Sequence, residues 1–155
     1  MRLRLLCLLF VFPILALAEP AGVVKLTTDQ ELSSVFDRVY KALEEEKFWV
    51  VFEADMGNRM AKFADKWGED YNRKGLDAVK SMVFCNIWWT NRIANADPDL
   101  LALCPLHISL YAKDGETVIL MPRLSALAEG GTGKEEAVEL ETALREIVES
   151  ALAAD

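Results

Sequence analysis

The sequence has 155 residues, of which 52% are hydrophobic, and its formal net charge is −8. This length and composition predict a single domain that buries a substantial hydrophobic core. The acidic charge argues against nucleic acid or an anionic membrane surface as a partner, because both would repel the chain at long range. A cationic partner or a neutral ligand is compatible with it.

The first 18 residues have the pattern of a secretory signal peptide. Two arginines precede an apolar stretch at residues 5–15, and the small residues of A-L-A at positions 16–18 form a cleavage site for signal peptidase. About thirteen apolar residues are too few to span a bilayer comfortably, so we expect cleavage after Ala18 and no membrane anchor. Residues 19–155 then form one domain in the periplasm or outside the cell, without stable membrane association.

Two cysteines, Cys85 and Cys104, remain after this cleavage. An even number of cysteines in an oxidising compartment favours a disulfide. A bond between these two would close a loop of about 20 residues and stabilise the fold by roughly 3 kcal/mol, because it restricts the unfolded chain.

The mature chain is expected to open with a strand, a helix and a second strand. A β-branched run predicts the first strand at residues 23–27. Thr28 and Glu31 have the spacing of a capping box, which predicts a helix from about residue 29 to 46 with Thr28 as its N-cap. We interpret the acidic end of this helix as a solvated face. The apolar run at residues 48–54 predicts the second strand.

A shorter helix, capped by Asn58, is expected next, and its apolar stripe is predicted to lie in the core. Residues 78–86 predict the third strand, and residues 87–95 read as a polar and aromatic connection. If that connection is extended, its two adjacent tryptophans point in opposite directions. The predicted core stripe of the short helix consists of Met60, Phe63, Ala64, Trp67 and Tyr71.

The second half of the chain is expected to form a hairpin and a closing helix. Asp97-Pro98 predicts the start of a short helix, since proline is favoured in a first turn. Strands at residues 106–112 and 117–121 flank Asp114-Gly115, a typical two-residue hairpin turn. A long acidic helix is predicted at residues 134–153. This order predicts an α+β two-layer sandwich with a mainly antiparallel five-stranded sheet.

The hairpin turn also predicts which strand residues share a face. It places Leu110 opposite Ile119, so one face is wholly apolar and is expected to lie under the helices. That face consists of Ile108, Leu110, Ile119 and Met121. The other face is mixed, and it could be a shallow ligand surface or a contact between two copies of the chain. It consists of His107, Ser109, Tyr111, Val118 and Leu120.

Residues 82–120 contain the segments F-C-N-I-W-W and L-C-P-L-H-I-S-L. This region resembles the domain-of-unknown-function 302 family, in which a strand ends in phenylalanine and a G-N-P turn and a leucine- and proline-rich segment later leads into a hairpin strand. The resemblance implies a strand-helix-four-strand-helix sandwich like the TATA-binding-protein-like folds, and no established enzyme activity. The chain differs from the family where Cys85 replaces a glycine, Ile87 a proline and Cys104 a leucine.

No catalytic motif is evident, so enzyme activity stays open, and non-enzymatic binding of a small ligand or a periplasmic protein is the favoured interpretation. The sequence lacks the G-x-S-x-G motif of many hydrolases, and its single histidine has no evident nucleophile as partner. No cofactor is expected. The side chains proposed to contact a ligand or partner are Trp88, Trp89, Asn91, Arg92, His107 and Tyr111.

Two alternatives to simple binding depend on the cysteines. The first is thiol redox or sulfur-handling chemistry with Cys104 and Cys85, although the C-x-x-C motif of thioredoxin-like proteins is missing. The second is a metal or haem site formed by Cys85, Cys104 and His107, whose ligand types suit copper or zinc. The C-x-x-C-H motif for covalent haem attachment is missing too.

Overall fold

The structure is a computed structural model that describes residues 22–154. The predicted signal peptide and its cleavage site lie outside these residues. The strands are β1 (Val23–Thr28), β2 (Trp49–Asp55), β3 (Ala78–Cys85), β4 (Leu106–Lys113) and β5 (Glu116–Pro122). The α-helices are α1 (Leu32–Glu45), α2 (Met56–Ala61), α3 (Ala64–Trp67), α4 (Ile87–Ala96), α5 (Leu124–Leu127) and α6 (Lys134–Ala153), and the 3-10 helices are η1 (Gly68–Asp70) and η2 (Pro98–Leu103).

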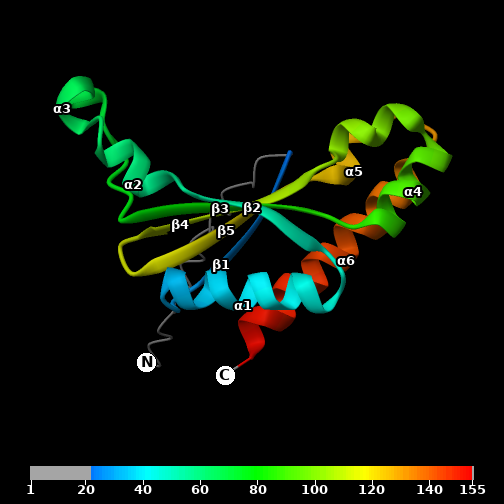
Figure 1. Ribbon diagram of the computed structural model, residues 1–155, viewed down its shortest axis with the longest axis horizontal. Coiled ribbons are helices and arrows are strands. Elements are labelled where there is room, and N and C mark those ends of the chain that lie inside the picture. The colour runs from blue at the N-terminus through cyan, green and yellow to red at the C-terminus, as the bar shows by residue number, and fades with distance from the viewer. Residues whose placement is uncertain (1–21, 155) are drawn as a thin grey trace, which may run out of the picture.

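Within residues 22–154, the strands form one antiparallel sheet of five strands in the order β1-β5-β4-β3-β2. Strands β1 and β2 are therefore its two edges. Helices α1 and α6 lie together on one side of the sheet (Figure 1). The predicted α+β two-layer sandwich and its strand-helix-four-strand-helix order are confirmed. No helix in this range is long and apolar enough to cross a membrane.

The hairpin register is the one that the turn predicts. Leu110 pairs with Ile119, Tyr111 with Val118, and Ala112 with Thr117. The predicted apolar face is fully inside: its four residues, Ile108, Leu110, Ile119 and Met121, are at most 4% exposed. They belong to the same core cluster as the buried faces of α1 and α6. The opposite face of the sheet includes the exposed side chain of His107.

Helix α1 begins later than the capping-box spacing predicts. Thr28 remains in β1, where it pairs with Thr117, so it cannot also serve as the helix cap. The N-cap is Glu31 instead, and its side chain accepts a hydrogen bond from the backbone N–H of Ser34 at 3.1 Å. The assignment of Thr28 as N-cap was therefore wrong, because strand pairing extends one residue further than predicted.

Residues 56–77, called the arm below, leave the end of the sheet and carry α2 and α3 away from it (Figure 1). Asp55, not Asn58, caps α2, and it accepts a hydrogen bond from the backbone N–H of Asn58 at 2.9 Å. The apolar stripe predicted to be core is not buried. Phe63 and Trp67 are 48% and 43% exposed and stack on each other with ring centroids 5.3 Å apart.

Residues 87–95 form most of helix α4, so the interpretation of this segment as a connection between elements was wrong. Asn86 caps this helix, because its Oδ1 accepts a hydrogen bond from the backbone N–H of Trp89 at 3.0 Å. Trp88 and Trp89 are therefore consecutive helical residues. Their side chains diverge by about 100° around the helix axis, as 3.6 residues per turn requires, and do not point in opposite directions.

Candidate functional site

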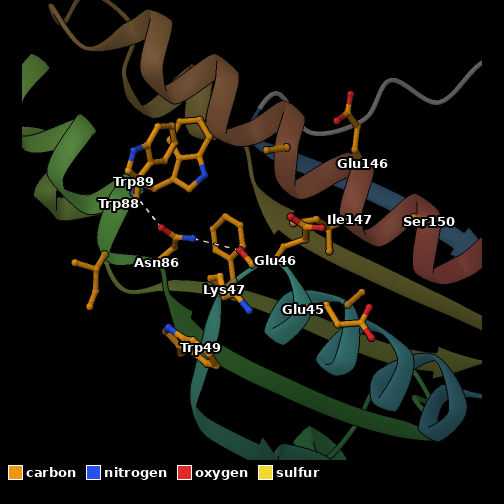
Figure 2. A pocket seen from close by; sticks show the side chains of 14 residues that line it. Glu45, Glu46, Lys47, Trp49, Asn86, Trp88, Trp89, Glu146, Ile147 and Ser150 are labelled. Atoms are coloured by element: carbon orange, nitrogen blue, oxygen red, sulfur yellow. Dashed lines mark hydrogen bonds between the residues drawn. The ribbon is translucent and has the colours of Figure 1, made fainter.

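A groove of about 680 Å³ lies where the end of α1, the start of β2, the start of α4 and one face of α6 meet. We call it the Trp groove (Figure 2). Hydrogen bonds of one residue, Asn86, hold the two helix ends that border the groove. Among the described residues that line it are the carboxylates of Glu45, Glu46 and Glu146 and the indoles of Trp49, Trp88 and Trp89.

Asn86 joins the two helix ends at the groove. It is buried, and while its Oδ1 caps α4, its Nδ2 donates a hydrogen bond to the backbone carbonyl of Glu46 at 3.4 Å (Figure 2). This carbonyl lies just beyond the last turn of α1, where backbone oxygens lack partners within the helix. One amide side chain therefore fixes the first turn of α4 against the end of α1.

Arg92 holds the two tryptophans of α4 in place. The rings of Trp88 and Trp89 meet edge to face, with centroids 4.8 Å apart. The Arg92 guanidinium carbon lies 5.3 Å from the first centroid and 4.9 Å from the second, and its Nη1 forms an ion pair with Glu139 of α6 at 2.6 Å. This hydrogen bond raises the pKa of Arg92 and lowers the pKa of Glu139. Arg92 thus anchors the aromatic pair to α6.

The groove carries more negative than positive charge. Its lining contains the three glutamates and one lysine, Lys47, whose Nζ lies 5.8 Å from the ring centroid of Trp49. The carbonyl end of α1 also borders it, and that end of a helix dipole favours cations. Trp49 and Trp88 are about half exposed, so their rings remain accessible. Aromatic faces beside carboxylates are a typical environment for an organic cation.

The two cysteines lie beside the first turn of α4 and share one hydrogen-bonding partner. Thr90 Oγ1 is 3.5 Å from the Cys85 sulfur and 3.7 Å from the Cys104 sulfur, and it donates to the carbonyl of Asn86 at 2.9 Å. Both thiols are free and partly buried. Burial raises the pKa of Cys104, the Thr90 hydrogen bond opposes this, and the neighbouring Cys85 raises the pKa further.

The predicted contact residues fall in two places. Trp88 and Trp89 line the Trp groove and Arg92 supports them, whereas Asn91 is an exposed residue of α4 outside the lining. Two others lie on the sheet face opposite the helices, where His107 pairs with Val83 and Tyr111 with Val79. In the described part of the chain, no group of three or more His, Cys, Asp or Glu side chains could hold a metal ion. The alternative metal site of Cys85, Cys104 and His107 therefore has no geometric support.

Sequence reasoning missed most of the polar lining of the groove. The acidic end of α1 was interpreted as a solvated face, and Trp49 was treated as a strand residue alone. The sequence does contain a signal for this lining: in E-E-E-K-F-W-V, three glutamates and a lysine precede a Phe-Trp pair at a helix-to-strand junction. Glu146 had no such signal, because only the packing of α6 against α1 brings it to the groove.

Comparison with known proteins identifies the domain. The model of the family described as domain of unknown function DUF302 matches residues 24–151. The crystal structure of an uncharacterized conserved DUF302 protein from Bacillus stearothermophilus is similar, with a TM-score of 0.69 and 19% sequence identity over 85% of this chain and 99% of that one. This likeness concerns the fold alone, and no curated protein matches the chain. The chain belongs to the DUF302 family.

Proposed function

We propose that this protein is an exported, non-enzymatic binding domain whose Trp groove holds a small organic cation with an apolar body. One observation carries the proposal: among the described residues, three indoles and three carboxylates surround a single groove of about 680 Å³. The indoles offer apolar contact and cation–π attraction, and the carboxylates offer charge complementarity. The periplasm or the extracellular space is the proposed location.

The groove is open in the single chain, and this openness sets the expected strength of binding. A cation over an exposed indole gains about 0.5–1 kcal/mol, and more when it is desolvated. Attraction to exposed carboxylates is screened by salt, because the Debye length is about 8 Å at physiological ionic strength. We therefore expect modest affinity that weakens as the salt concentration rises.

The test uses two aromatic probes of similar size and opposite charge, benzyltrimethylammonium and benzoate, titrated while tryptophan fluorescence is recorded. We expect a saturable change with the cation alone, lost on Trp88→Ala and weakened on Glu146→Gln. Glu149→Gln is the matched control, because Glu149 lies on the same helix and does not line the groove. An equal response to both probes, or none to either, would contradict the proposed function.

A disulfide between Cys85 and Cys104 is part of the proposal. Two sulfurs that contact the same hydroxyl at 3.5 and 3.7 Å support it. In an oxidising compartment, both thiols would lose their hydrogens to a thiol–disulfide oxidant, which is itself reduced to two thiols. The bond would join the end of β3 to the end of η2 beside the groove. Mass spectrometry of the exported protein should show the loss of two hydrogens, and two alkylatable thiols would exclude the bond.

A thiol redox function is the second candidate, and the shared position of the two cysteines favours it over other enzyme classes. The raised pKa of Cys104 opposes it, since the thiolate is the nucleophile in such chemistry. Replacing both cysteines by serine separates the two functions. Under the binding function the double variant is less stable but still binds benzyltrimethylammonium. Under the redox function it loses disulfide-exchange activity with a model disulfide substrate.

A further inference from the structure

Strand β2 is an edge strand with an unusual amount of exposed apolar surface. It is the last strand of the sheet, and Trp49, Val51 and Phe52 are 47%, 65% and 51% exposed. Edge strands have unpaired backbone groups, and proteins commonly protect them with charge, proline or covering segments. A bulge between Val50 and Phe52 interrupts the register, yet the strand still presents three large apolar side chains. Such an edge is suited to pairing with another strand.

The arm presents a second apolar surface, and its charge is opposite to that of the rest of the chain. Phe63 and Trp67 form its exposed stacked pair, and Lys62 and Lys66 precede them in the sequence. Residues 56–77 contain five basic and four acidic residues, a net charge of +1, whereas the rest of residues 19–155 contains ten basic and 21 acidic residues. The spacing of the arm's apolar residues is that of a buried stripe, but the described part of its own chain does not cover the pair.

The direction of β2 relates the arm to the Trp groove. The strand begins at the groove with Trp49 and ends at Asp55, directly before the arm, so the two features lie at opposite ends of the sheet (Figure 1). A chain therefore cannot place its own arm on its own groove. Two copies paired antiparallel along β2 would bring each arm to the groove end of the other copy. The same pairing brings Lys47, before the strand, towards Asp55 of the second copy.

We propose that the protein forms a symmetric dimer in which the β2 edges pair antiparallel and each arm covers the Trp groove of the second copy. Phe63 and Trp67 pack on the exposed Ile87 and Trp88 of the second copy, and the arm's lysines face its Glu45 and Glu46. Glu146 is then the carboxylate of the groove that remains available to an organic cation. The inference rests on the proposed function in one respect, because the second copy supplies the side chains that complete the ligand groove. The interface is isologous, as is usual for two-fold dimers.

The arm contact is necessary for a stable association. A strand of seven residues is about 23 Å long, so the β2 edges alone form a narrow strip. Stable interfaces bury roughly 1,200–2,000 Å² in total, which requires surface beyond that strip. Variants of the arm should consequently dissociate the dimer even when β2 is intact.

Sedimentation velocity over a range of protein concentrations tests the proposal. We expect a dimer for the wild type and monomers for Lys62→Glu/Lys66→Glu and for Glu45→Lys/Glu46→Lys. An equal mixture of the two variants should form dimers again. In the mixed dimer, the acidic arm of the first variant meets the basic groove of the second. The unchanged basic arm of the second variant meets the unchanged acidic groove of the first. Folding defects cannot produce this rescue, because each variant alone remains monomeric.

Two further variants test whether the interface lies along β2. Val51→Asp should dissociate the dimer, whereas Leu127→Ser should not, because Leu127 is a 61% exposed apolar residue of α5 away from β2. A wild type that stays monomeric at all concentrations, or a mixture that does not associate, would overturn the proposal. So would a monomeric wild type that binds vesicles of anionic phospholipid through its arm.

The same samples distinguish this inference from the proposed function. Titrating the monomeric Lys62→Glu/Lys66→Glu variant with benzyltrimethylammonium measures the groove without a second arm. A wild type that binds the probe but stays monomeric at all concentrations would leave the groove function intact and reject the dimer. A dimer with the expected rescue but no response to the probe would support the dimer and reject the ligand class.

Discussion

At the scale of single residues, Asn86 accounts for the position of the candidate site. It terminates β3, caps α4 and holds the carbonyl of Glu46, so one buried amide links three elements. Buried amides of this kind are costly when left unpaired and specific when satisfied. In the described chain no buried side-chain nitrogen or oxygen lacks a hydrogen-bonding partner. The geometry of the groove therefore depends on a fully satisfied polar residue.

Replacing Asn86 by alanine should lower the free energy of unfolding by about 1 kcal/mol, the typical loss for an N-cap. The tryptophan emission should also change, because the first turn of α4 carries Trp88 and Trp89. Urea unfolding and emission spectra measure the two effects. Asn91→Ala is the control, since Asn91 is exposed on the same helix and should change neither. Equal effects of the two substitutions would contradict the role of Asn86.

The reduced protein should show an unreactive Cys104. Burial raises its pKa above the ordinary 9.0, so iodoacetamide should modify it slowly at neutral pH, with a rate that rises only at more alkaline pH than for an exposed cysteine. Thr90→Val should shift this profile further upward, because the hydroxyl stabilises the thiolate. A profile with its midpoint at or below 9.0 would refute the assignment.

The same shift predicts a pH effect on stability in the reduced protein. The pKa is raised in the folded state, so the unfolded thiol ionises first as the pH increases. The contribution of Cys104 is fully present below the ordinary pKa and is lost as the pH rises through the folded value. Comparing urea unfolding of the reduced wild type and Cys104→Ser between neutral and alkaline pH measures this loss.

At the scale of elements, the sequence predicted strands better than helices. Strand alternation and the Asp114-Gly115 turn identified the hairpin and its register, because both signals are local. Helix α4 was missed because only Ile93 of it is buried and its apolar residues follow one another directly instead of at helical spacing. The arm was correctly predicted to be helical, but the prediction that its apolar stripe lies in the core was wrong. Periodicity shows that a helix has an apolar face and does not show what covers that face.

The Arg92–Glu139 ion pair should link α4 to α6 in a pH-dependent way. The hydrogen bond from Arg92 lowers the pKa of Glu139 below its ordinary 4.5. The pair therefore stabilises the folded state fully above pH 4.5, and this stabilisation is lost as the pH falls through the lower pKa of the folded state. The stability difference between wild type and Glu139→Gln should therefore shrink in acid. Glu149→Gln should show a smaller difference, because its i,i+4 partner at 3.8 Å is exposed. A difference independent of pH would contradict the link.

At the scale of the whole molecule, the sheet order shows what local signals omit. The chain's first strand lies at one edge beside β5, almost a hundred residues away in sequence, and β2 becomes the other edge. Helices α1 and α6 cover one face of this sheet together, an arrangement that no single segment of the sequence encodes. It also determines that the apolar residues of β2 remain exposed. The interface proposed above is thus a consequence of topology and not of a sequence motif.

The core and the proposed dimer interface should respond differently to alanine substitutions. Phe84 is fully buried and packs edge to face on Phe48 at 5.9 Å, so Phe84→Ala should lower the free energy of unfolding by about 3–5 kcal/mol at every protein concentration. Association stabilises only the folded state, so the urea midpoint of the wild type should rise with concentration. Phe63→Ala/Trp67→Ala should abolish that dependence and leave the midpoint at high dilution nearly unchanged.

Circular dichroism at two protein concentrations measures these midpoints for all three proteins. Phe84→Ala keeps the interface, so its lower midpoint should still rise with concentration. The arm variant loses no buried side chain, because both rings are about half exposed in the single chain. A urea midpoint of the wild type that does not change with protein concentration would show that no second copy covers these rings in solution. A large loss of stability in the dilute arm variant would show that they support the monomer itself, which contradicts their role in joining two copies.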